Sequence, residues 1–446
     1  MAPEKGGLSM SLVGIVIGLA LLIWFAFRGK SLIWAAPICA MVVALTGGLD
    51  MLSAYTVSYM EGFVGFVQDW FPAFLLSAIF GQIMEDSGGA QAITKAIVRL
   101  LGRNKAIFVS VLCGGVLAYG GISGFVIIFS MYPIVLGLFR EADISRRLIP
   151  ATVMAGAFTF AMSAIPGTPT IQNLIPGEYF GTPPTAAPVM GIICAVVMFV
   201  GPILWLNYRA KKLRSLGEGY SEPDELPEEI PDSELPSAIL CLLPFVVILV
   251  LLNLLHQHIV VSLLAGIVSS LAFLYISGFV RKKKYLRNLG ETFNKGSKSA
   301  VSAVMNTAAA VGFGSVVKLS PGFATLEAMV LSIEGSPLIA ESVAINILAG
   351  ATGSASGGLR IALDALAPSF IRMSEASGIP LAAFHRVGAI ACGGLNTLPH
   401  DGAVVTYLSY CKIPHKKGYF DMFIVAGAIP IIANIVAIIL GSVGIV

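Results

Sequence analysis

Long apolar runs separated by short polar segments make up most of the chain. A helix needs about 20 largely apolar residues to cross a bilayer, and ten runs approach or exceed that length. They are residues 10–27, 31–48, 66–84, 150–175 and 187–206 in the first half, and 237–254, 260–280, 299–317, 381–408 and 420–446 in the second. The pattern predicts an all-α polytopic membrane protein with about ten transmembrane helices.

Composition supports the membrane assignment and excludes several other classes. Hydrophobic residues make up 56% of the 446 residues and charged residues 12%, whereas a soluble domain has roughly 25% charged residues. The net charge of +3 is too small to indicate nucleic-acid binding. The six cysteines show no C-x-x-C spacing, so we expect no disulfide framework, no metal and no cofactor. Residues 10–27 are interpreted as a span, with a signal peptide as the alternative.

A polar segment divides the chain into two similar halves. Residues 207–236 carry a basic cluster followed by eight acidic residues. Aligning the sequence with itself at an offset of 233 residues pairs Ser123 with Ser356 and Pro166 with Pro399. We therefore predict two repeats, residues 1–206 and 237–446, joined by a cytoplasmic linker at 207–236.

The distribution of basic residues predicts that each repeat contains a re-entrant hairpin. Lys and Arg collect on the cytoplasmic side of membrane proteins, and counting spans from Arg28 places Lys105 and Arg140 on that same side. The apolar segment between them has a glycine-rich middle, and glycine costs roughly 1 kcal/mol in a helix interior. Residues 106–139 are therefore expected to enter and leave by one face. Residues 339–372 repeat this pattern from the opposite face, and inverted repeats with broken helices are typical of secondary transporters.

Four helix breaks combine Gly or Pro with hydroxyl or amide side chains. They are the hairpin tips at 120–124 and 353–358 and the interrupted spans at 163–168 and 396–402. Irregular backbone at membrane depth is tolerated only where it lines a cavity or is buried in protein, so we expect a binding site there. Half-helix N-termini would suit a carboxylate, and unwound carbonyls would suit a cation. Two alternatives stay open: kinks that only allow close helix packing, and hydroxyls that only bond to a carbonyl one turn earlier.

The second tip carries a family resemblance. The run Gly353-Ser354-Ala355-Ser356 resembles the Gly-Ser-Ala-Ser/Thr signature of the gluconate permease family, carboxylate symporters of the ion transporter superfamily. Residues 356–366 and 398–404 resemble its D-3-hydroxybutyrate permease branch, and the similarity covers nearly the whole chain, most specifically residues 350–405. The resemblance implies an elevator-type movement, a homodimer on a scaffold domain, and a substrate held between the two tips and the two unwound spans. Gluconate itself is less favoured, because sugar-acid members differ from Ser356 onward.

Ionisable residues within apolar segments are functional candidates, because a charge at the bilayer centre costs at least about 2.5 kcal/mol. Arg360 and Asp364 are four residues apart on one helical face; either they satisfy each other as an ion pair, or Asp364 orients Arg360 towards a substrate carboxylate. His400 and Asp401 lie in the second break, where each could carry a proton or face water. His385 and Arg386 are expected to reach from a span end to the membrane interface.

The candidate sites follow from the tips, the breaks and these charges. Candidates for proton coupling are Asp364, His400 and Asp401. Candidates for substrate binding are Gly120, Gly121, Ser123, Gly124, Thr168, Ser354, Ser356, Gly357, Arg360, Asn396, Thr397 and His400.

Together these features predict a non-enzymatic, multi-pass protein of a bacterial inner membrane. The expected function is symport of a small monocarboxylate, with D-3-hydroxybutyrate as the best candidate, coupled to protons or alternatively to sodium. A sugar-acid symporter is the nearest alternative. Two other classes remain open. An anion channel is one, and an intramembrane serine protease is the other, since Gly121-Ile122-Ser123-Gly124 matches the G-x-S-G pattern around such nucleophiles but needs a histidine base within reach.

Overall fold

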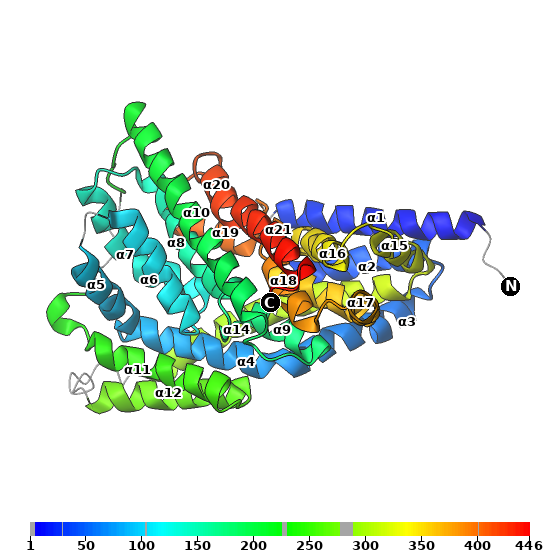
Figure 1. Cartoon of the computed structure of the whole chain (residues 1–446), viewed down its shortest axis with the longest axis horizontal. Helices are drawn as coiled ribbons and strands as arrows, with labels where there is room; N and C mark the ends of the chain where they lie inside the picture. The colour runs from blue at the N-terminus through cyan, green and yellow to red at the C-terminus, as the bar shows by residue number, and fades with distance from the viewer. Residues whose placement is uncertain (1–4, 29, 103–104, 225–229, 277–288, 400) are drawn as a thin grey trace.

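The computed structural model describes residues 5–28, 30–102, 105–224, 230–276, 289–399 and 401–446, and within them it contains helices and no strand (Figure 1). In the first half the helices are α1 (Lys5–Phe27), α2 (Leu32–Thr46), α3 (Met51–Ser53), α4 (Met60–Asp86), α5 (Gly89–Leu101), α6 (Ala106–Tyr119), α7 (Gly124–Glu141), α8 (Ile149–Ala157), α9 (Ile171–Phe180) and α10 (Pro188–Ser215). In the second half they are α11 (Ala238–Leu249), α12 (Ile259–Ile276), α14 (Leu289–Leu319), α15 (Pro321–Leu331), α16 (Pro337–Thr352), α17 (Ala355–Ser377), α18 (Leu381–Ala391), α19 (Gly402–Tyr410), α20 (His415–Phe423) and α21 (Ile429–Ser442).

Short π- and 3₁₀-helical turns interrupt or flank these helices. The π-helical turns are η1 (Ala54–Tyr59), η4 (Phe160–Ala164), η6 (Val250–Leu254) and η9 (Ile424–Ala428), and the 3₁₀ turns are η3 (Arg146–Leu148), η5 (Asp232–Glu234) and η8 (Leu395–Thr397). Such turns often occur at functional sites. Two of them, η4 and η8, coincide with the predicted span breaks.

Six helical stretches among the described residues are long and apolar enough to cross a membrane: Met51–Asp86, Gly124–Glu141, Arg146–Ala164, Pro188–Ser215, Leu289–Leu319 and His415–Ser442. The predicted runs 150–175 and 381–408 do not form continuous helices, because each is divided at its break. The all-helical, polytopic architecture is confirmed. The count of ten spans stays a prediction.

The long helices α4 and α14 pack closely and run antiparallel. Gly62 of α4 lies against Ser315 of α14, while Ile79, further along α4, lies against Gly296 at the other end of α14. A Cβ atom at Gly296 would lie 2.9 Å from Cα of Ile79, so the absence of side chains lets the two backbones approach. Small residues at helix contacts serve this purpose in membrane proteins.

Buried apolar side chains form two separate clusters. The larger one includes residues from α4 to α11 and from α16 to α21. The smaller one joins α1, α2 and η1 to the end of α14, around Phe313. In Figure 1, α1, α2 and α15 lie at one end of the molecule and α5 to α8 at the other, with α4 and α14 running between them. The pair α4–α14 therefore connects the two ends.

Helix boundaries recur at the repeat offset. Tyr119 ends α6 and Thr352 ends α16, 233 residues later; Asp86 and Leu319, which end α4 and α14, have the same separation. Helix α6 has 14 residues, about 21 Å, which is short of the roughly 30 Å hydrocarbon thickness. Re-entrant entry of the hairpins, the inverted relation of the halves and the domain boundaries stay predictions.

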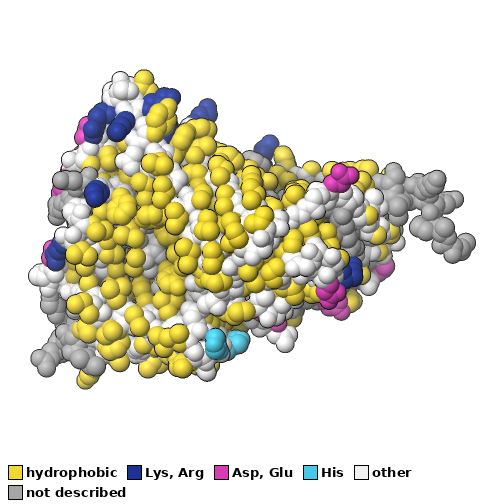
Figure 2. Space-filling model, in the orientation of Figure 1, with side chains coloured by type: hydrophobic (Ala, Val, Ile, Leu, Met, Phe, Trp, Pro, Cys, Tyr) yellow, Lys and Arg dark blue, Asp and Glu magenta, His cyan; other side chains and the backbone are white. Residues whose placement is uncertain are grey.

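The predicted linker begins as a continuation of a helix and is then held by ion pairs. Helix α10 extends to Ser215 rather than ending near residue 206. Beyond it, Glu218 pairs with Arg147 at 3.0 Å and Asp232 pairs with Lys95 at 2.8 Å. The hydrogen bond from Lys95 lowers the pKa of Asp232. Figure 2 shows Lys and Arg side chains at the end of the molecule where α5 to α8 lie, on the left in this view. Hydrophobic side chains cover the middle of the same face.

Candidate functional site

The first tip, residues 120–123 between α6 and α7, is anchored by three hydroxyl groups. The hydroxyl of Tyr119 donates to the carbonyl of Pro166 at 3.1 Å, that of Ser77 to Gly121 at 3.1 Å, and that of Tyr407 to Gly124 at 2.6 Å. These bonds join the tip to the first break, to α4 and to α19. Gly121 has a φ of +95°, a conformation that glycine adopts readily.

Helix α7 starts without a side-chain cap. Its N-cap residue, Ser123, is half-buried and makes no cap hydrogen bond. The first N–H groups of a helix have no partner within the helix and carry its positive dipole end. The start of α7 therefore offers donors at the tip.

The first break, residues 158–170 between α8 and α9, is built from side-chain bonds to unwound carbonyls. The fully buried hydroxyl of Thr168 donates to Ala161 O at 2.7 Å, and the hydroxyl of Thr170 donates to Met162 O. Asn173 donates to the carbonyls of Thr168 at 3.0 Å and Pro184 at 2.9 Å. The hydroxyl of Thr170 is used in this way, and α9 starts without a side-chain cap.

A buried arginine from the second half completes the first break. Arg386 of α18 is 0% exposed and donates to the carbonyls of Ser163 at 2.9 Å, Ala186 at 2.8 Å and Pro184 at 3.3 Å, and to the amide oxygen of Asn173 at 2.8 Å. No carboxylate lies within 4 Å of it in the described part of the chain. A buried charge needs hydrogen bonds of this kind to be tolerated.

The expectation that His385 and Arg386 reach the membrane interface is wrong. Both side chains are fully buried. The two ring nitrogens of His385 lie 2.7 Å from the hydroxyl of Thr182 and 3.3 Å from the amide oxygen of Asn173. The sequence-based interpretation placed them at a span end, but α18 packs against α9 and presents them to the first break.

The second tip, between α16 and α17, is capped by its own side chain. Gly353, the C-cap residue of α16, is in the left-handed region with φ +58°, and Ser354 accepts a hydrogen bond from the backbone N–H of Gly357 at 3.1 Å. Ser356 is buried, and Gly357 faces Thr307 of α14. The hydroxyl oxygen of Ser354 and the N–H of Gly357 are therefore already hydrogen-bonded to each other in this conformation.

The second break is also capped from within. Asp401 is the N-cap of α19 and accepts from the N–H groups of Ala403 and Val404 at 3.0 Å each. Thr397 donates to Ala426 O at 2.8 Å and contacts the amide oxygen of its neighbour Asn396 at 3.3 Å. His400 lies outside the described residues.

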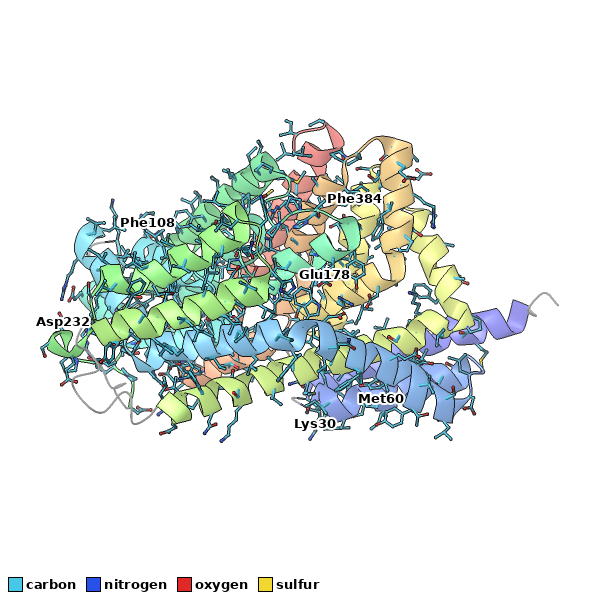
Figure 3. The ribbon with its side chains drawn as sticks, turned by 90° about the horizontal axis from the view of Figure 1, so that it is seen from below. Lys30, Met60, Phe108, Glu178, Asp232 and Phe384 are labelled. Carbon is cyan, nitrogen blue, oxygen red and sulfur yellow. The ribbon has the colours of Figure 1, made fainter. Side chains whose placement is uncertain are left out.

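Arg360 lies in an acidic cluster near the middle of the molecule, where Figure 3 labels Glu178. Its guanidinium group is 3.0 Å from Asp69 of α4, 2.8 Å from Glu178 of α9 and 3.3 Å from Asp364 on its own helix. Tyr179 donates to Asp364, and its ring lies 5.1 Å from the guanidinium carbon. Of the two interpretations left open by the sequence, the ion pair with Asp364 is present, enlarged by two further carboxylates. Substrate binding by Arg360 stays a prediction that requires these pairs to open.

The breaks and tips lie against one another. A Cβ atom at Gly121 would lie 3.6 Å from Pro169, which joins the first tip to the first break. One at Gly393 would lie 4.0 Å from Ser163 Oγ, which joins the two breaks. One at Gly350 would lie 2.9 Å from Leu395 Cβ, which joins the second hairpin to the second break.

Three polar residues of this core were not found from the sequence. They are Asn173, the acceptor for Arg386; Asn253, which donates to Gly167 O at 2.9 Å; and Glu341, a fully buried carboxylate of α16. Each is a polar residue in or beside an apolar segment, which is the signal that marks functional candidates in membranes. All three lie outside the segments that helix-breaking Gly and Pro residues mark.

Comparisons with known proteins place the chain among transporters. The family model "Tripartite ATP-independent periplasmic transporter, DctM component" matches residues 16–354. The uncharacterized transporter YxjC of Bacillus subtilis (strain 168) is 38% identical over 457 residues, covering 93% of this chain and 95% of the relative. An uncharacterized transporter of Haemophilus influenzae is 25% identical over 383 residues, covering 84% and 86%. The crystal structure of the Alcanivorax borkumensis YdaH transporter has a TM-score of 0.54 at 15% identity, covering 97% of this chain and 98% of that one, which is a likeness of fold.

These findings correct the family expected from the sequence. The resemblance to the gluconate permease family is wrong, because the family model that matches is that of the DctM component. The run at 353–356 consists of small residues. Such residues are common wherever membrane helices approach closely, so the run does not identify one family. The expectation of a multi-pass membrane transporter is confirmed, and the intramembrane protease is excluded along with other enzymes.

Proposed function

Because the chain belongs to the DctM component family of tripartite ATP-independent periplasmic transporters, we propose that it is a secondary transporter that carries a small organic monocarboxylate together with protons. D-3-hydroxybutyrate is retained as one candidate substrate, although the resemblance that suggested it has been corrected. Elevator-type movement and a homodimer remain part of the proposal.

The observation that carries the proposal is the first break and the tip beside it. Two helices, α7 and α9, start there without side-chain caps, and Gly121 lies close to Pro169 between them. The buried cation of Arg386 sits behind the break, bonded to Ser163 O and to Asn173 in the first turn of α9. Uncapped N–H groups, two helix dipoles and a fixed positive charge together favour an anion at this place.

The proposed contacts of the carboxylate are the N–H groups at Gly124 and Ile171 and the hydroxyl of Ser123. The other predicted substrate residues, in the second tip and the second break, would contact the remainder of the molecule once their mutual hydrogen bonds open. A monocarboxylate is favoured over a dicarboxylate because, among the described residues, the first break has uncapped helix starts beside a fixed cation, while Ser354 and Asp401 cap the second pair.

Counterflow in liposomes tests the transport proposal. Liposomes containing the purified protein are loaded with unlabelled D-3-hydroxybutyrate, lactate, succinate or gluconate. Uptake of the same acid in labelled form is then measured. A carrier gives transient accumulation, and the monocarboxylates should give the largest signal. Passive flux without counterflow would indicate the anion channel, and preference for succinate would contradict the single carboxylate site.

Substitution of Ser123 tests the position of the site. Ser123→Ala removes one hydroxyl donor and should raise the half-saturating concentration about tenfold, the effect of losing about 1.4 kcal/mol of binding. Ser302→Ala, on the exposed face of α14, is the matched control and should leave transport unchanged. Normal affinity in Ser123→Ala would remove this residue from the site.

The coupling ion is tested separately in the same liposomes. An inward proton gradient should drive accumulation without sodium, and a protonophore should abolish it. Accumulation that needs a sodium gradient and resists the protonophore would favour the sodium-coupled alternative.

A further inference from the structure

Glu341 is a buried carboxylate without a hydrogen-bond partner among the described residues. It lies in the second turn of α16, is 0% exposed, and neither of its carboxylate oxygens has a hydrogen-bond partner among the described residues. Oε1 would lie 3.1 Å from a Cβ atom placed on Gly388 of α18, so the glycine leaves the space that the carboxyl group occupies. The other close neighbour at that position is the side chain of Ile345.

None of the charged side chains described on the helices around α16 compensates this carboxylate. On α18, His385 and Arg386 are turned towards Asn173 and the first break. Arg386 is two residues from Gly388, about 200° around the helix, and therefore on the far side of α18 from Glu341. The elements α21 and η8 contain no titratable residue.

The remaining neighbours of α16 are α17, α1 and α15. On α17, the charged residues are engaged elsewhere or exposed: Arg360 and Asp364 in the acidic cluster, Arg372 with Ser369, and Glu375 at the surface. Helices α1 and α15 carry Lys5 and Glu327, whose side chains lie outside the described part of the chain. Within that part, no charged side chain of these helices pairs with Glu341, and neither of its carboxylate oxygens accepts a hydrogen bond.

A purely structural role does not account for a glutamate at this position. The residue at the corresponding place in the first half, 233 positions earlier, is Phe108, which packs edge to face against Phe199 at 5.7 Å. An aromatic or aliphatic side chain thus fills the equivalent position. An isolated ionised carboxylate in an apolar site is so unfavourable that the group takes up a proton instead. The cost of keeping an acid there indicates that the acid is used.

A metal cation is a poor occupant for this site. A sodium or divalent ion needs several oxygen ligands around it, whereas the carboxyl group of Glu341 lies beside Gly388, where the aliphatic side chain of Ile345 also approaches. No group of three or more acidic, His or Cys side chains that could hold a metal occurs in the described part of the molecule. A proton needs only the carboxylate itself.

We propose that Glu341 is the group that binds and releases the coupled proton. This inference rests on the proposed transport function and names the coupling residue for it. In the conformation described here the side chain is a neutral acid with its O–H bond formed. When water reaches it in another conformation, that O–H bond breaks, the proton passes to water as hydronium, and the carboxylate remains until it takes a proton from hydronium on the opposite side, which leaves water.

The position of Glu341 links protonation to the second hairpin. Further along the same helix, Asn346 accepts from the N–H of Leu395 at 3.2 Å, and Gly350 packs on the same residue. One residue after Glu341, Ser342 donates to Asn434 of α21, which in turn donates to Val387 O at 2.9 Å. A movement of α16 against α18 and α21 that admits water to Glu341 would therefore shift the second break as well.

Two measurements on the purified full chain test the proposal. The first is thermal stability against pH in Glu341→Gln. If folded wild type holds one more proton than the unfolded chain at neutral pH, its stability falls as pH rises above about 4.3, the ordinary value for Glu. In Glu341→Gln, this fall of stability with rising pH should be absent. In Glu375→Gln, a substitution of an exposed residue of α17, it should remain. An unchanged slope in Glu341→Gln would overturn the proposal.

The second measurement is transport of labelled D-3-hydroxybutyrate, lactate and gluconate. Glu341→Gln should lose accumulation driven by a proton gradient at least tenfold but keep counterflow within about twofold of wild type, and Glu341→Asp should keep driven accumulation with a shifted pH profile. Driven accumulation at the wild-type level in Glu341→Gln would overturn the inference. If wild type gives no counterflow of any acid, the proposed function fails instead, and the pH slope still decides whether Glu341 holds a proton.

Discussion

The two halves of the molecule place similar breaks at similar positions but complete them differently. In the first half, α7 and α9 start without side-chain caps, and the break is closed by Arg386 from the other half. In the second half, Ser354 and Asp401 cap α17 and α19 from within the same half. The difference teaches that the two halves share the positions of their breaks, while the proposed binding site lies where the first half is left incomplete.

The largest expected effect comes from removing the arginine that closes the first break. Arg386→Met keeps much of the volume but leaves the carbonyls of Ser163 and Ala186 without their side-chain donor, while the carbonyl of Pro184 keeps its bonds from Asn173 and Gly167. Each orphaned buried acceptor costs about 1–3 kcal/mol, so we expect a loss of about 3 kcal/mol or more in thermal unfolding in detergent. The stability of Arg386→Lys should lie between those of wild type and Arg386→Met, because lysine keeps the charge but has fewer donors. The exposed Arg372→Met is the control, and equal stability of all variants would refute the anchoring role.

A smaller effect is expected at the internal cap of the second break. Asp401→Ala should lower stability by about 1–2 kcal/mol because α19 loses an N-cap, whereas Asp401→Asn keeps an acceptor and most of the stability. If Asp401 acts as a cap, Asp401→Asn also keeps proton-driven accumulation. Loss of driven accumulation with intact counterflow in Asp401→Asn would instead assign proton coupling to Asp401, as the sequence suggested.

The two hairpin tips give a direct pairwise comparison. Ser354→Ala should lower the free energy of unfolding by about 1 kcal/mol, because its oxygen caps α17. Ser123→Ala should leave stability unchanged, because its hydroxyl makes no cap bond. Parallel thermal unfolding of both variants checks this. Equal losses at the two positions would show that the tips are alike and remove the asymmetry argument.

The smallest effect concerns the segment that joins the halves. The pKa of Asp232 is lowered by Lys95 and that of Glu222 by Arg140. Since a carboxyl with a lowered pKa contributes stability above its unfolded value, the attachment should be complete above pH 3.8 to 4.5 and be lost as pH falls below these values. The protection of the amides of residues 216–224 and 230–236 from hydrogen exchange, relative to the intrinsic rate at each pH, should fall only in that acidic range. A fall in protection near pH 7 would contradict the ion-pair attachment.

Features with a local sequence signal were predicted well. The hairpin tip at Gly353 and the interruption near Pro166 follow from helix-breaking residues inside apolar runs, and both positions carry breaks in the structure. The membrane class follows from composition. Helix ends were less predictable: α10 continues to Ser215, and its Arg209 pairs at 2.6 Å with Asp421, a partner more than 200 residues away that the local sequence does not show.

Features that depend on distant partners were missed. Arg386 looked like an interface residue because its acceptors, including Asn173, come from another half of the sequence. Arg360 shows only Asp364 as a nearby charge along the chain, while Asp69 and Glu178 approach it through the fold. Glu341 has no local signal either, because what distinguishes it is that neither carboxylate oxygen has a hydrogen-bond partner in the described part of the chain.

The reach of Arg386 across the chain has a consequence for biosynthesis. Its acceptors Ser163 and Ala186 are synthesised at least 200 residues earlier. At roughly 5–20 residues per second, translation needs about 10–40 s to supply the arginine. During that interval the nascent first half carries carbonyls whose eventual donor does not yet exist, so it cannot mature independently, and a gene split at the linker would have to deliver both fragments to the same insertion site.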